Sequence, residues 1–390
     1  MLSPENQKSG PLAGIRVVDL TRVLSGPFCT MMLGDMGAEV IKIDRPDSGD
    51  DTRAFAPPYQ GKESAYFLTV NRNKKSVTLD LKHTAAKEAL WRLVEGADVL
   101  VENFRPGAAA RLGFSYDDVA TRNAGLIYGS ISGFGDTGPE AARPGYDLIV
   151  QGESGMMHIT GDPHGPPTKM GTSIADMVAG MMLSQGILAA LHARSATGKG
   201  QHVKVSMLEA LASLLTYQAG NYYATGASPQ RRGNAHPSIV PYETIQAADG
   251  WLNVAVANDA LWGKFCDAID KPDWKENPRF AAAPDRVRNR DELMPLLTEV
   301  LKTKDRAHWI AAMGSHGVPC GAIAKVDEIC ESETLKARGM IWEMDHPTAG
   351  KVRTIGNPIV FTDTTLGEPA PPPHLGEHTE AVLSDAGYGL

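Results

Sequence analysis

Cysteine is scarce in this chain, and the few cysteines present exclude two kinds of protein. Its 390 residues include only Cys29, Cys266, Cys320 and Cys330. These are too few for a disulfide framework, and none has the short spacing of zinc ligands. We therefore expect a reducing compartment and no metal site. Cys320 is interpreted as a structural thiol, because no base lies near it in the sequence.

Positive charge is also in short supply. Lysine and arginine number 38 against 46 acidic residues, which gives a net charge of −8, and no basic run occurs. This balance argues against a nucleic-acid partner. The first ten residues lack the apolar core of a signal peptide, and we expect no apolar run long enough to span a membrane. The sequence thus favours a cytoplasmic globular protein.

The glycine fingerprint of dinucleotide-binding folds is missing from a segment that otherwise suits one. Residues 15–20 and 40–44 are predicted strands, and residues 28–36 a helix with Ser25 as its cap. Asp44 imitates a ribose-binding acid. The turn between strand and helix, however, reads TRVLSG rather than GxGxxG. Without those glycines the backbone cannot approach a pyrophosphate in the usual way, so NAD or FAD binding is not expected.

The pattern of strands and helices continues along the chain. Such alternation is typical of a doubly wound, Rossmann-like α/β domain. A Gly- and Pro-containing linker follows, and then a predicted hairpin opens a smaller α+β domain. Further strands are expected at 76–80, 98–102, 126–131 and 201–206, helices at 84–95, 116–120 and 207–223, and the hairpin at 242–246 and 251–256. The expected domains are a large one at 1–224, a small one with its linkers at 225–329, and a C-terminal segment at 330–390.

Asp176 stands out because it begins a long apolar helix that runs to about His192. A carboxylate there lies close to the protein interior, which is costly unless backbone N–H groups or a ligand stabilise it. The helix N-terminus offers such groups and would also stabilise an oxyanion. Alternatively, Ser173 and Asp176 form a capping box, which is the commoner explanation of such a pattern. From these residues alone, both interpretations stay open.

Six short motifs occur in order along the chain: residues 19–27 (DLTRVLSGP), 37–43 (GAEVIKI), 71–76 (NRNKKS), 101–107 (VENFRPG), 145–147 (GYD) and 198–201 (GKGQ). Together they resemble the class III CoA-transferases, the group of formyl-CoA transferase and carnitine CoA-transferase. The resemblance runs from about residue 11 to residue 378. Residues 49–53, 157–161, 235–242 and 343–348 further resemble succinyl-CoA:glutarate-type dicarboxylate CoA-transferases.

This resemblance implies that Asp176 is the catalytic nucleophile. Its carboxylate would attack the donor thioester, and the released CoA thiolate would return to give an aspartyl-CoA thioester. Only coenzyme A and acyl-CoA, as substrates, and backbone N–H groups would be needed, with no permanent cofactor. By matched position, the CoA contacts of the family fall on Val23, Leu24, Arg45, Leu79, Lys82, Asn103, Phe104 and Arg111. Leu24 stands where formyl-CoA transferase has glutamine, which disfavours formate or oxalate as substrate.

The resemblance also implies an assembly and a substrate class. We expect an interlocked homodimer in which residues 330–390 return to the large domain and close each chain into a ring. The expected donor is succinyl-CoA, and the expected acceptor is a short dicarboxylic acid such as glutarate. A second carboxylate must be paired or hydrogen-bonded in the cleft. Arg53, Arg72, Arg105, Arg232 and His236 are candidates that the sequence does not rank.

Two alternative functions are weighed against transfer. The α-methylacyl-CoA racemases also resemble this chain and use a His–Asp pair, in which the aspartate corresponds to Asp176. The position of their histidine is occupied by Tyr146. Tyrosine ordinarily has a pKa of about 10, so it is a poor proton acceptor at neutral pH. The other alternative is an inactive CoA-binding protein, which the presence of Asp176 in its motif disfavours.

Overall fold

The computed structural model describes residues 9–388 and divides them into two compact units. Unit 1 holds the residues up to Met156, the segment Lys169–Tyr223 and the residues from Glu333 onward. Unit 2 holds Met157–Thr168 and Ala224–Ser332. The loop before the Asp176 helix is thus shared between the units.

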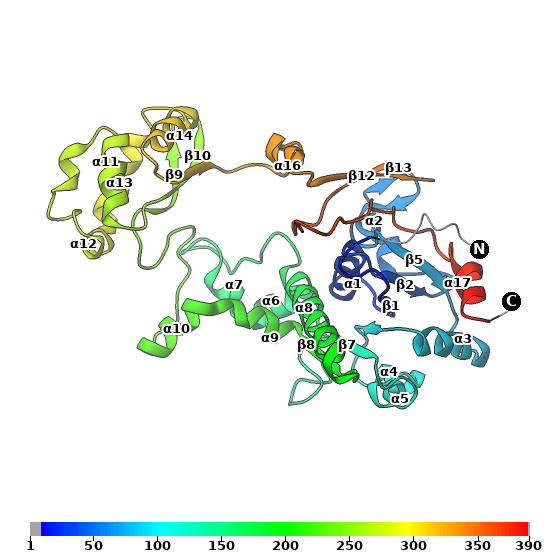
Figure 1. The fold of residues 1–390 in the computed structure, drawn as a ribbon. Coiled ribbons are helices and arrows are strands. Elements are labelled where there is room, and N and C mark those ends of the chain that lie inside the picture. The colour runs from blue at the N-terminus through cyan, green and yellow to red at the C-terminus, as the bar shows by residue number, and fades with distance from the viewer. Residues whose placement is uncertain (1–8, 389–390) are drawn as a thin grey trace. The chain divides into compact units, whose positions relative to one another are not determined.

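A six-stranded sheet forms the centre of unit 1 (Figure 1). Its strand order is β5-β2-β1-β6-β7-β8, and every neighbouring pair is parallel. The predicted α/β class with a parallel central sheet is therefore confirmed. The chain moves along the sheet one way from β1 to β5 and the other way from β6 to β8. The strands are β1 Arg16–Asp19, β2 Glu39–Asp44, β5 Lys74–Thr78, β6 Val99–Glu102, β7 Ile127–Ser132 and β8 His202–Ser206.

Both faces of this sheet are buried, because successive residues of a strand point to opposite sides. Val17 belongs to one hydrophobic cluster and Val18 to the other. The Val17 cluster includes residues of α1 (Ser25–Asp35), α6 (Asp147–Glu153), α8 (Ile174–Thr197) and α9 (Met207–Ala212). The Val18 cluster includes residues of α3 (Thr84–Glu95), α5 (Tyr116–Arg122) and α17 (Thr379–Asp385).

Helix α8 packs closely on α1 through Gly180. A Cβ atom at Gly180 would lie 2.5 Å from the backbone oxygen of Ser25, so only glycine permits this approach. By length and composition, α8 is apolar enough to cross a membrane, which shows that the expectation of no such run was wrong. Its buried residues, including Leu183 and Ile187, belong to the core of unit 1. A core helix of a globular protein has the same character.

The C-terminal residues of unit 1 cover the edge strand β5. Asn73 donates its backbone N–H to the oxygen of Ala370, and Thr78 donates to the hydroxyl of Thr379, both at 3.0 Å. An edge strand covered in this way has fewer free groups for pairing with another chain. The smaller elements of unit 1 include β3 Tyr59–Gln60, β4 Glu63–Ser64, α2 Ala65–Val70, α4 Ala108–Leu112, α16 Glu333–Ala337, β12 Ile341–His346 and β13 Gly350–Ile355.

Unit 2 combines a three-stranded antiparallel sheet, of order β11-β10-β9, with helices packed on it (Figure 1). Trp262 and Phe265 are buried in its core. Arg286 is buried too, and its guanidinium reaches Asp259 at 2.7 Å. The elements are β9 Tyr242–Ala247, β10 Gly250–Ala255, β11 Cys320–Ala322, α11 Asp259–Ala268, α12 Ala283–Arg288, α13 Arg290–Leu301, α14 Arg306–Ser315 and α15 Val326–Cys330.

Two local predictions need correction. The helix expected at 207–223 is broken: α9 ends at Ala212, a 3-10 turn follows at Ser213–Leu215, and α10 (Thr216–Thr225) begins at Thr216, whose φ is +37°. Ser25 is not the cap of α1 but its first residue, and Leu24 occupies the cap position without a side-chain bond. The Ser25 hydroxyl is therefore available for another contact.

Candidate active site

The site lies where the strand order reverses, between β1 and β6. Ligands of open α/β sheets bind in the crevice outside the carboxyl ends of such strands. Here Arg22 follows β1 and Asn103 follows β6. The side chain of Asn103 accepts the backbone N–H of Arg22 at 2.9 Å and donates to the backbone oxygen of Arg22 at 2.7 Å. The next residue, Val23, has a φ of +69°, which a β-branched side chain rarely adopts. Asp50 accepts its N–H at 3.2 Å, so the surroundings keep this strained conformation.

A buried charge network lies behind this loop. The Lys42 ammonium is fully buried, donates to the backbone oxygen of Thr21 at 2.7 Å and pairs with Asp50 at 2.9 Å. Lys74 pairs with Asp19 and donates to the oxygen of Pro27, both at 3.0 Å. Charged groups thus fix the loop before and after Val23.

The pKa values in this network favour the charged forms of three of its members. Burial opposes ionisation of Asp50, but Lys42 outweighs it and lowers the pKa of that carboxyl to about 2. Burial likewise opposes the charge of Lys42, yet Asp50 and Asp19 raise the pKa of the ammonium above its usual value. The pKa of Asp19 is lowered against the effect of burial by Lys74 and Lys42.

In front of the loop, Asp176 lines a cavity of about 300 Å³. The capping-box interpretation is wrong, because Ser173 makes no side-chain cap bond. The cap comes instead from Asp147, which accepts the N–H of Ala175 at 2.9 Å. Asp176 instead hydrogen-bonds the Ser25 side chain. Its carboxyl therefore lies near the first turns of both α1 and α8. Other lining residues are Val23, Asn103, Phe104, Arg105, Ser132, Gly133, Gly145, Tyr146 and Met207.

The electrostatics of Asp176 differ from those of an ordinary surface carboxylate. Burial raises the pKa of its carboxyl to about 7, the neighbouring charge of Asp147 adds to this shift, and the Ser25 hydrogen bond opposes it. Asp176 forms no ion pair with a cation among residues 9–388. A carboxylate that is poorly solvated and free of a counter-ion is a better nucleophile, and such groups cluster at functional sites.

A second cavity, of about 620 Å³, collects most of the expected CoA contacts. Arg45, Leu79, Lys82 and Arg111 line it together with Phe104. Phe104 and Arg22 line both cavities. The expected contacts therefore fall on two adjoining hollows, with Val23 and Asn103 beside Asp176. Leu24 lines neither hollow and is buried as the cap of α1.

The five candidate partners of an acceptor carboxylate separate clearly. Arg72 is buried and pairs with Asp35 at 2.6 Å. The Arg53 guanidinium lies 3.7 Å from the centre of the Phe67 ring and donates to the backbone oxygen of Pro373. Both serve internal contacts. Arg232 and His236 belong to unit 2, where Arg232 lines a separate cavity of about 320 Å³. Of the five candidates, Arg105 alone lines the cavity of Asp176.

Sequence reasoning missed two further arginines of this cavity, Arg22 and Arg143. Arg22 lies 3.5 Å from Asp51, and Arg143 pairs with Glu153 at 2.6 Å. The signal for Arg22 was its place directly after β1, where ligands of α/β sheets bind. Arg143 stands before Pro-Gly in a loop, and nothing in the sequence places that loop against β7.

Two glycines bring the Tyr146 loop to the cavity. A Cβ on Gly145 would lie 2.4 Å from the Cα of Gly133, so the loop and the end of β7 touch backbone to backbone. Tyr146 is consequently at the rim, 66% exposed, and the following Asp147 reaches the start of α8. The GYD motif thus positions an aromatic ring and a capping carboxylate beside Asp176.

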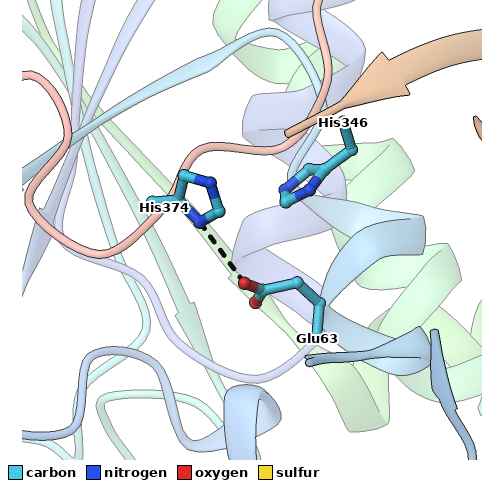
Figure 2. Close-up of side chains that lie close together, drawn as sticks. All are labelled: Glu63, His346 and His374. Atoms are coloured by element: carbon cyan, nitrogen blue, oxygen red, sulfur yellow. Dashed lines mark ion pairs between the residues drawn. The ribbon is translucent and has the colours of Figure 1, made fainter. Parts of the chain in front are cut away.

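Glu63, His346 and His374 gather elsewhere in unit 1, as Figure 2 shows, in a pattern that could hold a metal. His374 lies 3.3 Å from the Glu63 carboxylate. The Nδ1 atom of His346, however, accepts backbone N–H groups of the following turn, including that of Ala349 at 3.1 Å, and the backbone of Pro372 also hydrogen-bonds this ring. A neutral imidazole bonded in this way has no lone pair left for a metal. We interpret the cluster as a contact that joins β4, β12 and the C-terminal segment at His374.

Comparisons with known proteins agree with this geometry. The model of the family described as CoA-transferase family III matches residues 12–379. A succinyl-CoA:glutarate CoA-transferase of Homo sapiens is 38% identical over 375 residues, which are 96% of this chain and 86% of the relative. An acetyl-CoA:oxalate CoA-transferase of Acetobacter aceti is 44% identical over 90% of this chain and 89% of the relative.

A solved structure has the same fold. The crystal structure of a CAIB/BAIF family protein from Brucella suis superposes with a TM-score of 0.86 at 39% identity. The match covers 97% of this chain and 100% of that one. Fold and sequence therefore point to the same family.

Proposed function

The chain belongs to CoA-transferase family III, and we propose that it moves CoA from succinyl-CoA to a short dicarboxylic acid through a thioester on Asp176. One observation carries the proposal. A partly buried carboxyl without a cationic partner lies in a cavity, near the first turns of α1 and α8, and adjoins a second cavity that collects the expected CoA contacts.

The proposed steps balance as four acyl exchanges, two with the donor and two with the acceptor. The Asp176 carboxylate attacks the donor thioester carbon, the C–S bond breaks, and a mixed anhydride and CoA thiolate form. The thiolate then attacks the aspartyl carbonyl of the anhydride, which releases the donor acid and leaves an aspartyl-CoA thioester. The acceptor acid repeats these events in reverse order. Each tetrahedral oxyanion would be stabilised by the N-terminal ends of α1 and α8.

The two cavities suit the two ends of the donor. Arg45, Lys82 and Arg111 supply positive charge in the larger cavity, where the phosphates of CoA would bind. The thioester would lie beside Asp176 in the smaller one. Phe104 and Arg22 line both cavities, so the pantetheine arm would pass along them.

A dicarboxylate is the proposed acceptor because of the relatives and because of Arg105. Glutarate, oxalate and mesaconate, which the relatives' names mention, all carry two carboxylates. Arg105 lines the cavity of Asp176, and its side chain forms no ion pair with any of residues 9–388. It is thus the proposed partner of the distal carboxylate. The Acetobacter aceti relative gives a reason to test oxalate despite Leu24.

We also propose the interlocked homodimer, in which residues 330–390 close each chain into a ring. Large apolar side chains are exposed on α6 and α10, including Leu148 at 53% and Tyr223 at 82%. Exposed groups of this kind are typical of an interface. Light scattering after size exclusion should give twice the chain mass, and a stable monomer at micromolar concentration would contradict the proposal.

Trapping of the intermediate tests the mechanism. Enzyme incubated with succinyl-CoA and then with hydroxylamine should carry a hydroxamate on Asp176, detected by mass spectrometry. Asp176→Ala should keep its circular dichroism spectrum and lose transfer by several orders of magnitude. Appreciable turnover by this variant would rule out the aspartyl route.

A deuterium experiment separates transfer from racemisation. A 2-methylacyl-CoA in deuterated water should show no enzyme-dependent uptake at the α-carbon, because the position of the racemase base holds Tyr146. Rapid uptake would instead favour the racemase alternative. A chain that binds CoA but catalyses neither reaction would be the inactive CoA-binding protein.

A further inference from the structure

A second carboxyl without a cation lies at the end of β6. Glu102 is only 9% exposed, and its Oε2 atom accepts the backbone N–H of Phe104 at 2.7 Å. In the described part of the chain, it forms no ion pair with a cation. Burial raises the pKa of this carboxyl to about 7, and the bond from Phe104 opposes the shift. The carboxyl thus changes its charge near neutral pH, and its charged form is the better acceptor.

The residue that Glu102 holds has a central place in the site. Phe104 lines the cavity of Asp176, the larger cavity beside it and a third hollow of about 290 Å³, which Glu102 itself lines. The guanidinium of Arg22 lies 5.9 Å from the centre of the Phe104 ring. Asn103, between Glu102 and Phe104, fixes the backbone of Arg22. A rotation of the peptide before Phe104 would therefore disturb both the CoA cavity and the loop after β1.

Two of the other charged or titratable residues that line the third hollow, Lys204 and His202, are engaged elsewhere. Lys204 pairs with Asp136 at 2.5 Å. His202 hydrogen-bonds Ser130 at 2.8 Å, and burial, followed by the charge of Lys204, lowers the pKa of this imidazole to about 4. The remaining titratable or charged residues of the hollow are Arg105, Tyr116, Tyr128 and Glu209. The hydrogen bond to Phe104 is therefore the main polar contact of Glu102.

We infer that Glu102 is a positioning residue for acyl-CoA, whose carboxylate orients the loop at 103–107 so that Phe104 and Asn103 shape the CoA site. Protonation of Glu102 replaces a charge-assisted bond by a weaker one, which lets the loop move and lowers the affinity for CoA. The inference rests on the proposed function, because it assumes that CoA binds in these cavities.

Calorimetric titration with CoA tests this inference without requiring turnover. All proteins carry Asp176→Asn, so that the nucleophile does not titrate. Between pH 8.5 and pH 5.5, the dissociation constant of this background protein should rise roughly three- to tenfold more than that of Glu102→Gln. The amide keeps an acceptor for the Phe104 N–H but has no charge to lose. Titration of the CoA phosphates is common to both proteins and cancels in the comparison.

The matched control is Glu209→Gln, which alters an exposed carboxylate of the same hollow. It should follow the background protein at every pH. Identical curves for Glu102→Gln and the background protein would overturn the inference, whereas no CoA binding by the native chain would overturn the proposed function itself. If Glu102→Gln does not fold, the background protein alone provides the test. Its dissociation constant should then show a step near pH 7, and a constant that follows only the titration of the CoA phosphates would overturn the inference.

Discussion

Two groups of carboxylates lie on opposite sides of the loop after β1, and they have opposite electrostatics. Behind the loop, Asp19 and Asp50 are fully buried and paired with lysines, and their pKa values are lowered. In front of it, Asp176 and Glu102 line cavities and form no ion pair within residues 9–388, and their pKa values are raised to about 7. The buried pairs support the loop, whereas the unpaired carboxyls are poised to react or to change charge. Burial alone does not distinguish a structural acid from a functional one, but the partner does.

The largest expected effect on stability follows from breaking the network behind the loop. Lys42→Met leaves Asp50 buried beside Asp44 without its cation, which should lower the free energy of unfolding by about 3–5 kcal/mol. Lys204→Met is the matched control, because Lys204 and Asp136 form a half-exposed pair that is worth about 1 kcal/mol at most. Calorimetric melting should separate the two variants clearly. Equal melting temperatures would show that the network does not support the fold.

A smaller effect on stability should come from the close contact between α1 and α8 at Gly180. Alanine normally stabilises a helix relative to glycine by about 1 kcal/mol, but a Cβ at Gly180 meets the Ser25 oxygen. We expect Gly180→Ala to destabilise the protein by about 1–3 kcal/mol. It should also reduce transfer, because Ser25 moves away from Asp176. Gly263→Ala in α11, where a Cβ meets nothing, should be neutral or stabilising in the same melting experiment. Destabilisation by both variants would show that Gly180 is not special.

The sequence predicted the parallel sheet well because the signals are local. Gly37 after the first helix and the apolar stretch at 40–44 fix that turn and strand without reference to other segments. Asp176 could also be singled out, because a carboxylate at the start of an apolar helix is conspicuous. Family resemblance, rather than physics, supplied the expected CoA contacts, which stay a prediction.

What the sequence could not show depends on contacts between distant segments. Ser173 and Asp176 look like a capping box, yet Asp147, 28 residues earlier than Ala175, takes the capping role. The motif VENFRPG carries part of the family resemblance, but the sequence does not show that Glu102 forms no ion pair within the described residues. Lys42 stands in an apolar strand, a sign of a buried charge, but its partner Asp50 lies beyond the strand.

Ionisation of the unpaired Asp176 should itself lower the stability of the protein. Its pKa in the folded state lies above the ordinary value, so ionisation destabilises the fold as pH rises from about 4 to about 7. Asp176→Asn should therefore be more stable than the native chain at pH 8, by about 1–2 kcal/mol. The full value of about 1.4 kcal/mol per pKa unit is discounted because the side chain is partly exposed. Melting temperatures at pH 5 and pH 8 check this. A native chain that is the more stable one at pH 8 would contradict an unpaired carboxylate.

The smallest expected effect is on the pH dependence of the rate, and it isolates the contribution of Asp147 to the raised pKa of Asp176. In the proposed mechanism transfer requires ionised Asp176, so the rate of the native chain should fall as pH falls through about 7. Asp147→Asn removes a neighbouring negative charge, which lowers the pKa of Asp176 and moves the acid limb of the rate profile to lower pH. The amide oxygen still accepts the N–H of Ala175, so the start of α8 should stay in place. The shift should be modest, because burial rather than Asp147 is the larger cause of the raised pKa.

The control for this measurement is Glu88→Gln, which changes an exposed carboxylate of α3. It removes a negative charge from a residue that lines neither the cavity of Asp176 nor the larger cavity beside it, so its acid limb should coincide with that of the native chain. If Asp147→Asn also leaves the limb in place, burial accounts for the whole shift of Asp176, and Asp147 serves only as a cap. A limb that moves to higher pH would mean that Asp147 stabilises the ionised nucleophile through its contacts, and the electrostatic contrast across the loop would then be incomplete.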